Sequence, residues 1–281
     1  MREALICAFD FEWTNKTIMY DAYARTVSPF QNSDMVAEGP PSPEELALIE
    51  PFRGQIPDEV FGLPFVPPMS DGSGQDRALL RKAVQLLNEA GCVVKDGKRV
   101  LPNGEPITIE FLNDELAATA PRALHQESRT LGIDATFRLV DAVQYRARVE
   151  DFDFDMTMQR FSFSATPGDS MRPFFSSQAA KTKGSYNLAG ISNPAIDALI
   201  EKIIGANGRH ELTVACRAFD RVFRAGRYWV PQWYRNTHPI AYWDQFGHTE
   251  KLAKYTQASV RRRIGGTMRP RPPSSNRRSS R

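Results

Sequence analysis

Hydrophobic and polar positions change their period several times along the chain, and each change marks the end of a predicted element. Apolar residues recur with a helical period over five stretches, residues 2–24, 76–90, 118–131, 195–204 and 210–225. Apolar and polar residues alternate, as in half-buried strands, over residues 107–112, 133–140 and 152–158. The turn Lys95-Asp96-Gly97-Lys98 predicts a hairpin, and residues 229–234 are typical of a buried strand. This alternation of helices and strands predicts an α/β lobe with a mixed sheet flanked by helices.

Capping residues indicate where several of these elements begin and end. Ser42 is followed three positions later by Glu45, which predicts the start of a short helix over residues 43–49. Gly132 predicts a helix C-terminus just before a strand. Asp141 predicts the N-cap of a short helix that carries Tyr145. The first helix is expected to bury one stripe of residues spaced by four, Leu5, Phe9, Trp13 and Thr17.

Residues 28–74 are punctuated throughout by proline and glycine, and only the helix at 43–49 has a regular pattern. So long an irregular segment is unusual inside a compact domain. The sequence therefore predicts an extended loop here.

The residue types that catalysis or metal binding requires are not found at the required spacings. The four histidines have no zinc-ligand spacing, and they fall in unrelated elements, at His125, His210, His238 and His248. The sequence has no GxSxG, Walker or GxGxxG motif. The acidic run Glu150, Asp151, Asp153 and Asp155 lacks the glycine and the bidentate acid of a calcium loop, which favours a solvated strand face. We therefore expect a protein that is not an enzyme, with no metal and no cofactor.

The cysteines and the hydropathy limit the other classes. Cys7, Cys92 and Cys216 have no metal or CxxC spacing, and their odd count leaves at least one free thiol. Cys7 and Cys216 lie in apolar helical stripes, which predicts buried, inert thiols. No stretch approaches the roughly 18 apolar residues of a membrane span. The N-terminus lacks the basic-then-apolar pattern of an export signal, so the chain as written is expected to stay in the cytoplasm.

Positive charge is concentrated at the C-terminal end. Residues 261–281 contain eight arginines and no acid, so the formal net charge of +3 becomes −5, by difference, for the rest of the chain. Proline and serine between the arginines, with no aromatic side chain for base stacking, predict a disordered basic tail over residues 258–281. The alternative is a basic-tailed protein that binds nucleic acid nonspecifically by neutralising phosphates.

Five short motifs follow one another along the chain. They are Arg2-Glu3-Ala4-Leu5, the helix of residues 76–91, Leu131-Gly132-Ile133 with Tyr145, Asp153-Phe154-Asp155-Met156, and Asn187-Leu188-Ala189-Gly190 with Asn193-Pro194. In this order they resemble the extracytoplasmic solute-binding proteins of ABC importers, in the peptide/nickel-binding family (family 5). Phe9-Asp10-Phe11-Glu12-Trp13 and Val230-Pro231-Gln232-Trp233-Tyr234 are similar to the YejA-like oligopeptide-binding branch of that family.

The resemblance implies a type II periplasmic-binding-protein-like lobe. Residues 1–235 would form the second lobe of such a protein, with residues 28–74 as a loop that wraps it. Residues 236–257 would return towards the first lobe, with Ile240-Ala241-Tyr242-Trp243 as the crossing strand. Family chains are much longer, so we interpret this chain as a C-terminal fragment with an incomplete two-lobe architecture.

The loop of residues 160–169 is the leading candidate for the ligand surface. Ser162, Ser164 and Thr166 offer hydroxyls for a peptide main chain, and the aromatic side chains of Phe161 and Phe163 offer apolar walls. In several family members an acid in this loop holds the N-terminal amine of the peptide, which implies such a role for Asp169. The alternative is a simple turn in which Asp169 caps the next segment. Arg160 could bind a peptide carboxylate or instead form a salt bridge with Asp155.

Two further residues are candidates with a structural alternative. By resemblance, Asn187 packs beneath the ligand loop, so it is more readily structural than ligand-binding. Trp233 could face the ligand or fill the core, as aromatic residues of apolar strands commonly do.

These expectations combine into one function. The resemblance implies a periplasmic, monomeric substrate-binding component of an ABC transporter, which captures oligopeptides without covalent chemistry and delivers them to permease subunits. Binding is expected to be weakened by the missing lobe. No specific nucleic-acid partner and no membrane span are expected.

Overall fold

The computed structural model describes residues 1–114 and 119–237, and residues 1–234 form one compact unit. Expectations for residues 238–281, among them the crossing strand Ile240–Trp243 and the basic tail, lie outside the described residues. No helix of the described part is long and apolar enough to cross a membrane.

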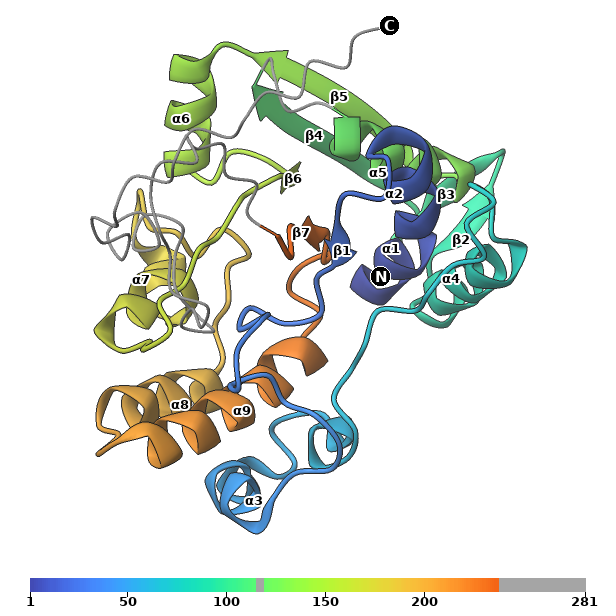
Figure 1. The fold of residues 1–281 in the computed structure, drawn as a ribbon. Helices are drawn as coiled ribbons and strands as arrows, with labels where there is room; N and C mark the ends of the chain where they lie inside the picture. The colour runs from blue at the N-terminus through green and yellow to red at the C-terminus, as the bar shows by residue number, and fades with distance from the viewer. Residues whose placement is uncertain (115–118, 238–281) are drawn as a thin grey trace, which may run out of the picture. The chain divides into compact units, whose positions relative to one another are not determined.

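Three parallel strands form the main sheet, in the order β5-β4-β6 (Figure 1). The central strand β4 (Thr108–Asp114) pairs along its whole length with β5 (Asp134–Val140) and over two residues with β6 (Met156–Thr157). The predicted hairpin is present as β2 (Val93–Lys95) and β3 (Lys98–Val100), and β1 (Ala24–Arg25) pairs antiparallel with β7 (Trp233–Tyr234). The α/β prediction is confirmed, and in the described residues parallel and antiparallel pairs lie in separate sheets.

One hydrophobic core lies between the main sheet and four helices. They are α1 (Arg2–Ala8), α2 (Phe11–Ile18), α4 (Arg77–Glu89) and α5 (Thr119–Thr130). Because side chains alternate along a strand, Ile109 and Phe111 of β4 both enter this core, where Leu87 of α4 is fully buried. The helix α6 (Ala142–Glu150) also contacts β4.

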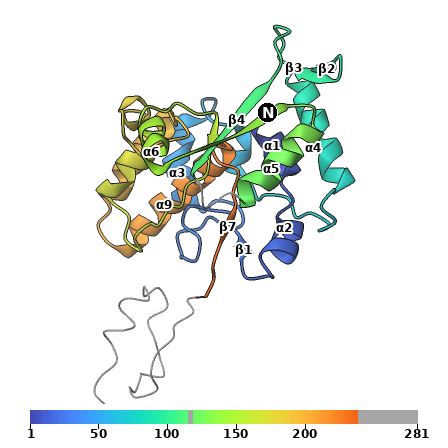
Figure 2. The same cartoon turned by 90° about the horizontal axis from the view of Figure 1, so that it is seen from above.

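A second core is built from helices of the C-terminal half and the irregular segment. Its helices are α3 (Pro43–Ile49), α7 (Arg172–Phe175), α8 (Pro194–Ile204) and α9 (Arg209–Ala225). Short 3-10 turns accompany them, η1 (Glu50–Phe52), η2 (Asp58–Phe61), η3 (Asp169–Met171) and η4 (Ala179–Lys181). Figure 2 shows α3 and α9 on one side of the β1–β7 pair, with α1, α4 and α5 on the other. The three predicted caps are confirmed: the side chains of Ser42 and Asp141 accept helix N–H bonds, and Gly132 has a φ of +81°.

The irregular segment of residues 28–65 is held by three buried charged side chains of α9, namely Asp220, Arg221 and Arg224. Their partners on the segment are the Ser28 hydroxyl, the Ala37 amide, the Glu45 carboxylate and the carbonyls of Gly62 and Phe65. Arg221 and Glu45 are 2.7 Å apart, and their side chains are 0% and 5% exposed. Hydrogen bonds from one helix thus help to order this segment.

The predicted helix over residues 2–24 is wrong because the chain breaks after Ala8. Phe9 has an extended backbone, and Asp10 restarts the helix as the N-cap of α2, accepting a bond from the Trp13 amide at 2.9 Å. The change of helix axis takes Thr17 out of the predicted stripe and leaves it exposed.

The predicted strand over residues 152–158 is largely wrong. Phe152 has a φ of +57°, which no strand residue adopts, and only Met156–Thr157 pair with β4. Asp153 instead accepts a bond from Arg148, and Asp155 accepts one from the Glu110 amide. The carboxylates therefore form no common strand face, because each is used by a different local partner.

The predicted buried strand over residues 229–234 is also shorter than expected. Only Trp233 and Tyr234 pair, and both are half-buried. Their apolar side chains are needed at the junction with β1 rather than in a sheet interior.

Candidate functional site

The ligand loop begins as an extended continuation of β6. From Gln159 to Ala165 the backbone belongs to no helix or strand. The side chains of Phe161 and Phe163 are half-buried, whereas those of Ser162 and Ser164 are exposed. This alternation follows from the period of an extended chain, which sends neighbouring side chains to opposite sides. The loop thus presents its hydroxyls outwards and its aromatic rings inwards.

The inward rings join an aromatic cluster that fixes the loop. The ring of Phe161 stacks on Trp229 with centroids 4.7 Å apart, and Phe163 meets Phe174 at 5.3 Å and Phe175 at 5.5 Å. Tyr186, which is 60% exposed, stacks in turn on Phe174. Aromatic pairs at such spacings favour a defined geometry, so this extended backbone has a rigid support.

Within the described part of the chain, the N–H and C=O groups of residues 159–164 make no hydrogen bond to another backbone group. They lie beyond the end of β6, where pairing with β4 has stopped. An exposed extended backbone with unused donors and acceptors can pair with another extended chain.

The far end of the loop is tied to its surroundings. The Ala165 carbonyl accepts a bond from Arg209 at the start of α9, and the Thr166 amide donates to the Ser164 hydroxyl at 3.1 Å. Asp169, with a side chain 83% exposed, accepts a bond from the Arg172 guanidinium at 2.8 Å. A ligand ammonium at Asp169 would therefore compete with Arg172.

Arg160 lies on the opposite side of the segment from Phe161 and is exposed. It forms no ion pair with Asp155 in the described structure, where the Asp155 carboxylate accepts a bond from the Glu110 amide at 2.8 Å. Its role towards a ligand carboxylate stays a prediction.

Asn187 is 1% exposed. Its side-chain amide donates to the carbonyls of Ser176 and Ile191, and its oxygen accepts from the Ile191 amide at 2.8 Å. This geometry fits the structural alternative, since all three contacts are to the protein backbone.

Replacing Asn187 with alanine is expected to lower the free energy of unfolding by about 2–4 kcal/mol, because three buried backbone groups lose their partner. Urea denaturation measures the change. Ser162→Ala, at an exposed hydroxyl, serves as the control and should shift stability by less than about 0.5 kcal/mol. An unchanged midpoint for N187A would contradict the structural role.

Trp233 contacts Phe9 and Tyr23 at centroid distances of 6.5 and 6.1 Å, and it is half-buried. The structure thus places it at the β1–β7 junction, away from the aromatic cluster named above. Its ligand role stays a prediction.

A polar cluster at the start of the loop was missed by the sequence analysis. The Tyr145 hydroxyl lies 2.8 Å from the Thr157 hydroxyl, and it accepts a bond from the Gln159 amide at 3.1 Å. The motif search located Tyr145 on its helix, but the pairing of α6 with β6 is a tertiary contact that spacing does not reveal.

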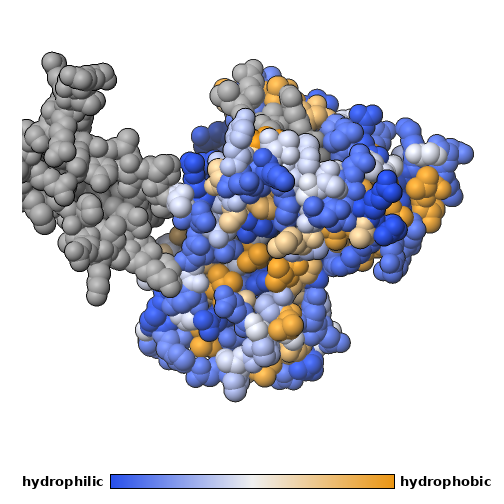
Figure 3. All heavy atoms as spheres, turned by 45° about the vertical axis from the view of Figure 1, so that its right-hand side comes forward, coloured by the Kyte–Doolittle hydropathy of each residue, from blue (hydrophilic) through white to orange (hydrophobic). Residues whose placement is uncertain are grey.

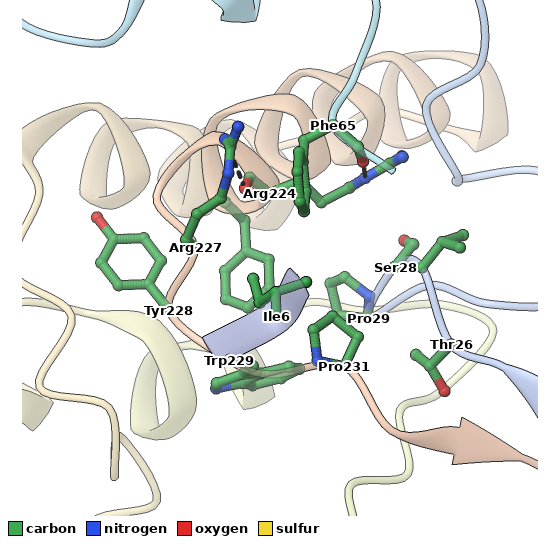
Figure 4. Close-up of a pocket in the computed structure, with 12 residues that line it drawn as sticks. Ile6, Thr26, Ser28, Pro29, Phe65, Arg224, Arg227, Tyr228, Trp229 and Pro231 are labelled. Carbon is green, nitrogen blue, oxygen red and sulfur yellow. Dashed lines mark hydrogen bonds between the residues drawn. The ribbon is translucent and has the colours of Figure 1, made fainter. Parts of the chain in front are cut away.

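Two hollows in the described part of the structure are lined by residues outside the loop. Figure 4 shows the first, of about 350 Å³, with Phe65 on one side of Ile6 and Trp229 and Pro231 on the other. Figure 3 shows apolar residues gathered in a hollowed band, with hydrophilic residues above and below it. A ligand site that is completed by another lobe need not form a hollow on one lobe alone. The absence of the loop from these two hollows therefore leaves it as the better candidate.

The second hollow, of about 470 Å³, is lined by the C-terminal part of α5 and by the break between α1 and α2. Glu127 accepts a bond from the Asp10 amide at 3.0 Å, and its other carboxylate oxygen is buried with no hydrogen-bond partner. Burial raises the pKa of Glu127 to about 8, and burial lowers the pKa of the neighbouring Arg25 to about 10.

The described residues offer few groups for metal binding or redox chemistry. No group of three or more potential ligands gathers there. Cys7, Cys92 and Cys216 are all buried free thiols, as predicted for the first and the last of them. Burial raises the pKa of Cys216 to about 12, which keeps its thiol protonated and inert.

Comparison with known proteins places this geometry in a family. The family model described as bacterial extracellular solute-binding proteins, family 5 Middle, matches residues 1–183. The chain belongs to this family. The resemblance expected from the five motifs is thereby confirmed, and members of family 5 are periplasmic proteins that bind substrates rather than convert them.

Similar proteins of the same family are known from several bacteria. A probable peptide-binding protein YejA of Agrobacterium fabrum is 40% identical over 257 residues, covering 91% of this chain and 42% of the relative. The peptidoglycan-binding protein YepA of the same organism is 36% identical, covering 86% of this chain and 40% of the relative. The chain therefore spans about two fifths of the length of the curated relatives it matches.

The fold is shared with solved family 5 structures. The oligopeptide-binding protein AppA of Bacillus subtilis, solved with a nonapeptide, superposes with a TM-score of 0.62 at 16% identity. The match covers 83% of this chain and 41% of AppA. This likeness confirms the type II binding-protein lobe.

Proposed function

We propose that the chain contributes one wall of an oligopeptide site in the substrate-binding component of an ABC importer. The observation that carries this proposal is the extended, rigidly supported segment of residues 159–164, whose backbone groups are free within the described structure. A peptide added as a strand satisfies such groups without regard to its side chains. Its capture is non-covalent, and permease subunits complete the transport.

Individual residues take complementary roles in this proposal. The hydroxyls of Ser162, Ser164 and Thr166 bind main-chain groups of the peptide, and the exposed cation of Arg160 attracts a carboxylate. Phe161 and Phe163 act from below, by holding the segment extended.

A peptide from the cell wall is one form that the ligand can take. The relative YepA is named for peptidoglycan binding, and peptidoglycan contains short peptides. The exposed face of Tyr186, stacked on Phe174, offers an apolar platform beside the loop. A plain oligopeptide and a muropeptide, compared in one titration, distinguish the two ligand classes.

The experiment is an amide-resolved NMR titration of residues 1–281 with tetra-alanine. Because one wall contacts only part of a ligand, we expect a dissociation constant on the order of 1 mM, with shifts confined to residues 157–169. A micromolar constant would argue against the single wall, and shifts elsewhere or none at all would overturn the proposed site.

A tetra-alanine with methylated main-chain nitrogens is expected to bind about tenfold more weakly, because it can no longer donate to the free carbonyls of the segment. The same titration measures this ratio, and the protein itself is unaltered. Equal affinity for the two peptides would show that strand addition is not the binding mode.

A further inference from the structure

One hydroxyl group contacts three successive residues at the start of the ligand loop. The Tyr145 hydroxyl lies 2.8 Å from the Thr157 hydroxyl, donates to the Met158 carbonyl at 3.3 Å, and accepts from the Gln159 amide at 3.1 Å. A tyrosine hydroxyl can donate one bond and accept others, and with Thr157 as a donor all three contacts are satisfied together. A side chain of α6 thus holds the chain at this point.

These contacts lie where the loop leaves the main sheet. The pair of Thr157 with Leu112 is the last one between β6 and β4, and Met158 is the next residue along the chain. Residues 159–164 then continue as extended backbone, without a hydrogen bond to another backbone group in the described part of the chain. Tyr145 therefore binds the chain at the boundary between the paired strand and the ligand segment.

The position of Tyr145 is itself fixed by the helix that carries it. Tyr145 and Arg148 are three residues apart on α6, which places them on one face of the helix. The Arg148 guanidinium donates to Glu110 of β4 at 2.7 Å and to Asp153 at 2.8 Å, so this face is tied to the sheet. Burial raises the pKa of Tyr145 above its ordinary value, so the phenol keeps the proton that it donates.

The rest of the segment has its own anchors. In the middle, the ring of Phe161 stacks on Trp229 at 4.7 Å, and at the far end the Ala165 carbonyl accepts a bond from Arg209. Tyr145 supplies the anchor at the start. A segment that is already held extended loses less conformational entropy when a peptide pairs with it, which favours binding.

We propose that Tyr145 is a positioning residue for peptide binding, whose hydroxyl fixes the start of residues 159–164 so that this segment is extended before the ligand arrives. This inference rests on the proposed function and adds to it a residue that prepares the site without touching the peptide. The phenol ring remains in Tyr145→Phe, so this variant removes the three polar contacts alone.

The test compares tetra-alanine with its main-chain N-methylated form in the NMR titration of residues 1–281. Y145F is expected to bind tetra-alanine about five- to tenfold more weakly. Its preference for the plain peptide should fall from about tenfold to about twofold or less, because main-chain bonds form only with an extended segment. The matched control Tyr20→Phe, at a side chain that is 88% exposed, should keep both the affinity and the preference. Urea denaturation verifies that each variant is folded.

The opposite results separate this inference from the proposed function. If Y145F keeps the affinity and the preference of the unaltered chain, the hydroxyl has no positioning role, and the proposed function stands. If Y145F binds both peptides more weakly but keeps the preference, the hydroxyl affects only the general fold and the inference is wrong. An equal loss in Y20F would contradict it too. If tetra-alanine shifts no residue of 157–169 in the unaltered chain, the proposed function fails, and the inference with it.

Discussion

Replacing Arg221 with methionine is expected to lower the free energy of unfolding by about 3–5 kcal/mol. The guanidinium and the Glu45 carboxylate are both buried, 2.7 Å apart, so the variant leaves a buried anion without its counter-charge. Arg221 also donates to the carbonyls of Gly62 and Gly39, which lose their partner too. Urea denaturation measures the loss, and limited proteolysis should show earlier cleavage within residues 28–65.

Two variants make this expectation specific. Arg53→Ala removes an exposed pair with Glu50, both about half exposed, and should cost less than about 1 kcal/mol. The double variant R221M/E45M removes both buried charges and should recover much of the stability, because no ion is left unpaired. If R221M is no more destabilised than R53A, the Arg221–Glu45 pair does not hold the irregular segment.

The free energy of unfolding of the unaltered chain is expected to fall between about pH 4.5 and 8. Replacing Glu127 with glutamine should make this fall shallower. Burial raises the pKa of this carboxyl from 4.5 to about 8, so in that range the folded state keeps a proton that the unfolded state has released. Stability then falls by as much as about 1.4 kcal/mol per pH unit, and the loss is complete above the folded pKa. The glutamine variant, neutral throughout, should be the more stable protein at pH 8.5.

The measurement is the free energy of unfolding at several pH values for both proteins. Glu110→Gln is a control of opposite sign: burial opposes ionisation there, but hydrogen bonds from Arg148 and Arg138 hold the pKa of Glu110 below its usual range. Its contribution is present above the unfolded pKa and is lost as the pH falls. Parallel pH profiles for E127Q and the unaltered chain would show that Glu127 is ionised in the fold.

Capping residues in the sequence correctly predicted where several helices begin or end. Gly132, Asp141 and Ser42 occupy the caps expected of them, because capping depends on the backbone within three residues. The alternation of residues 152–158 predicted a strand that is largely absent. The backbone turns at Phe152, and Asp153 and Asp155 accept hydrogen bonds from two different partners, Arg148 and the Glu110 amide.

The sequence predicted a loop at residues 160–169, but it did not predict which partners the side chains of this loop have. The outward serines and inward phenylalanines follow from simple alternation. The pairing of Asp169 with Arg172 could have been suspected from their spacing of three. The contact of Tyr145 with Thr157 could not, because it joins α6 to β6.

The sequence by itself determined the α/β lobe, most helix and strand positions and the family, because periodicity, caps and ordered motifs act over short stretches of chain. Only the tertiary structure decided which charges are buried and how α9 orders residues 28–65. Those properties depend on contacts between residues far apart in the chain, such as Arg221 with Glu45, for which no local pattern exists.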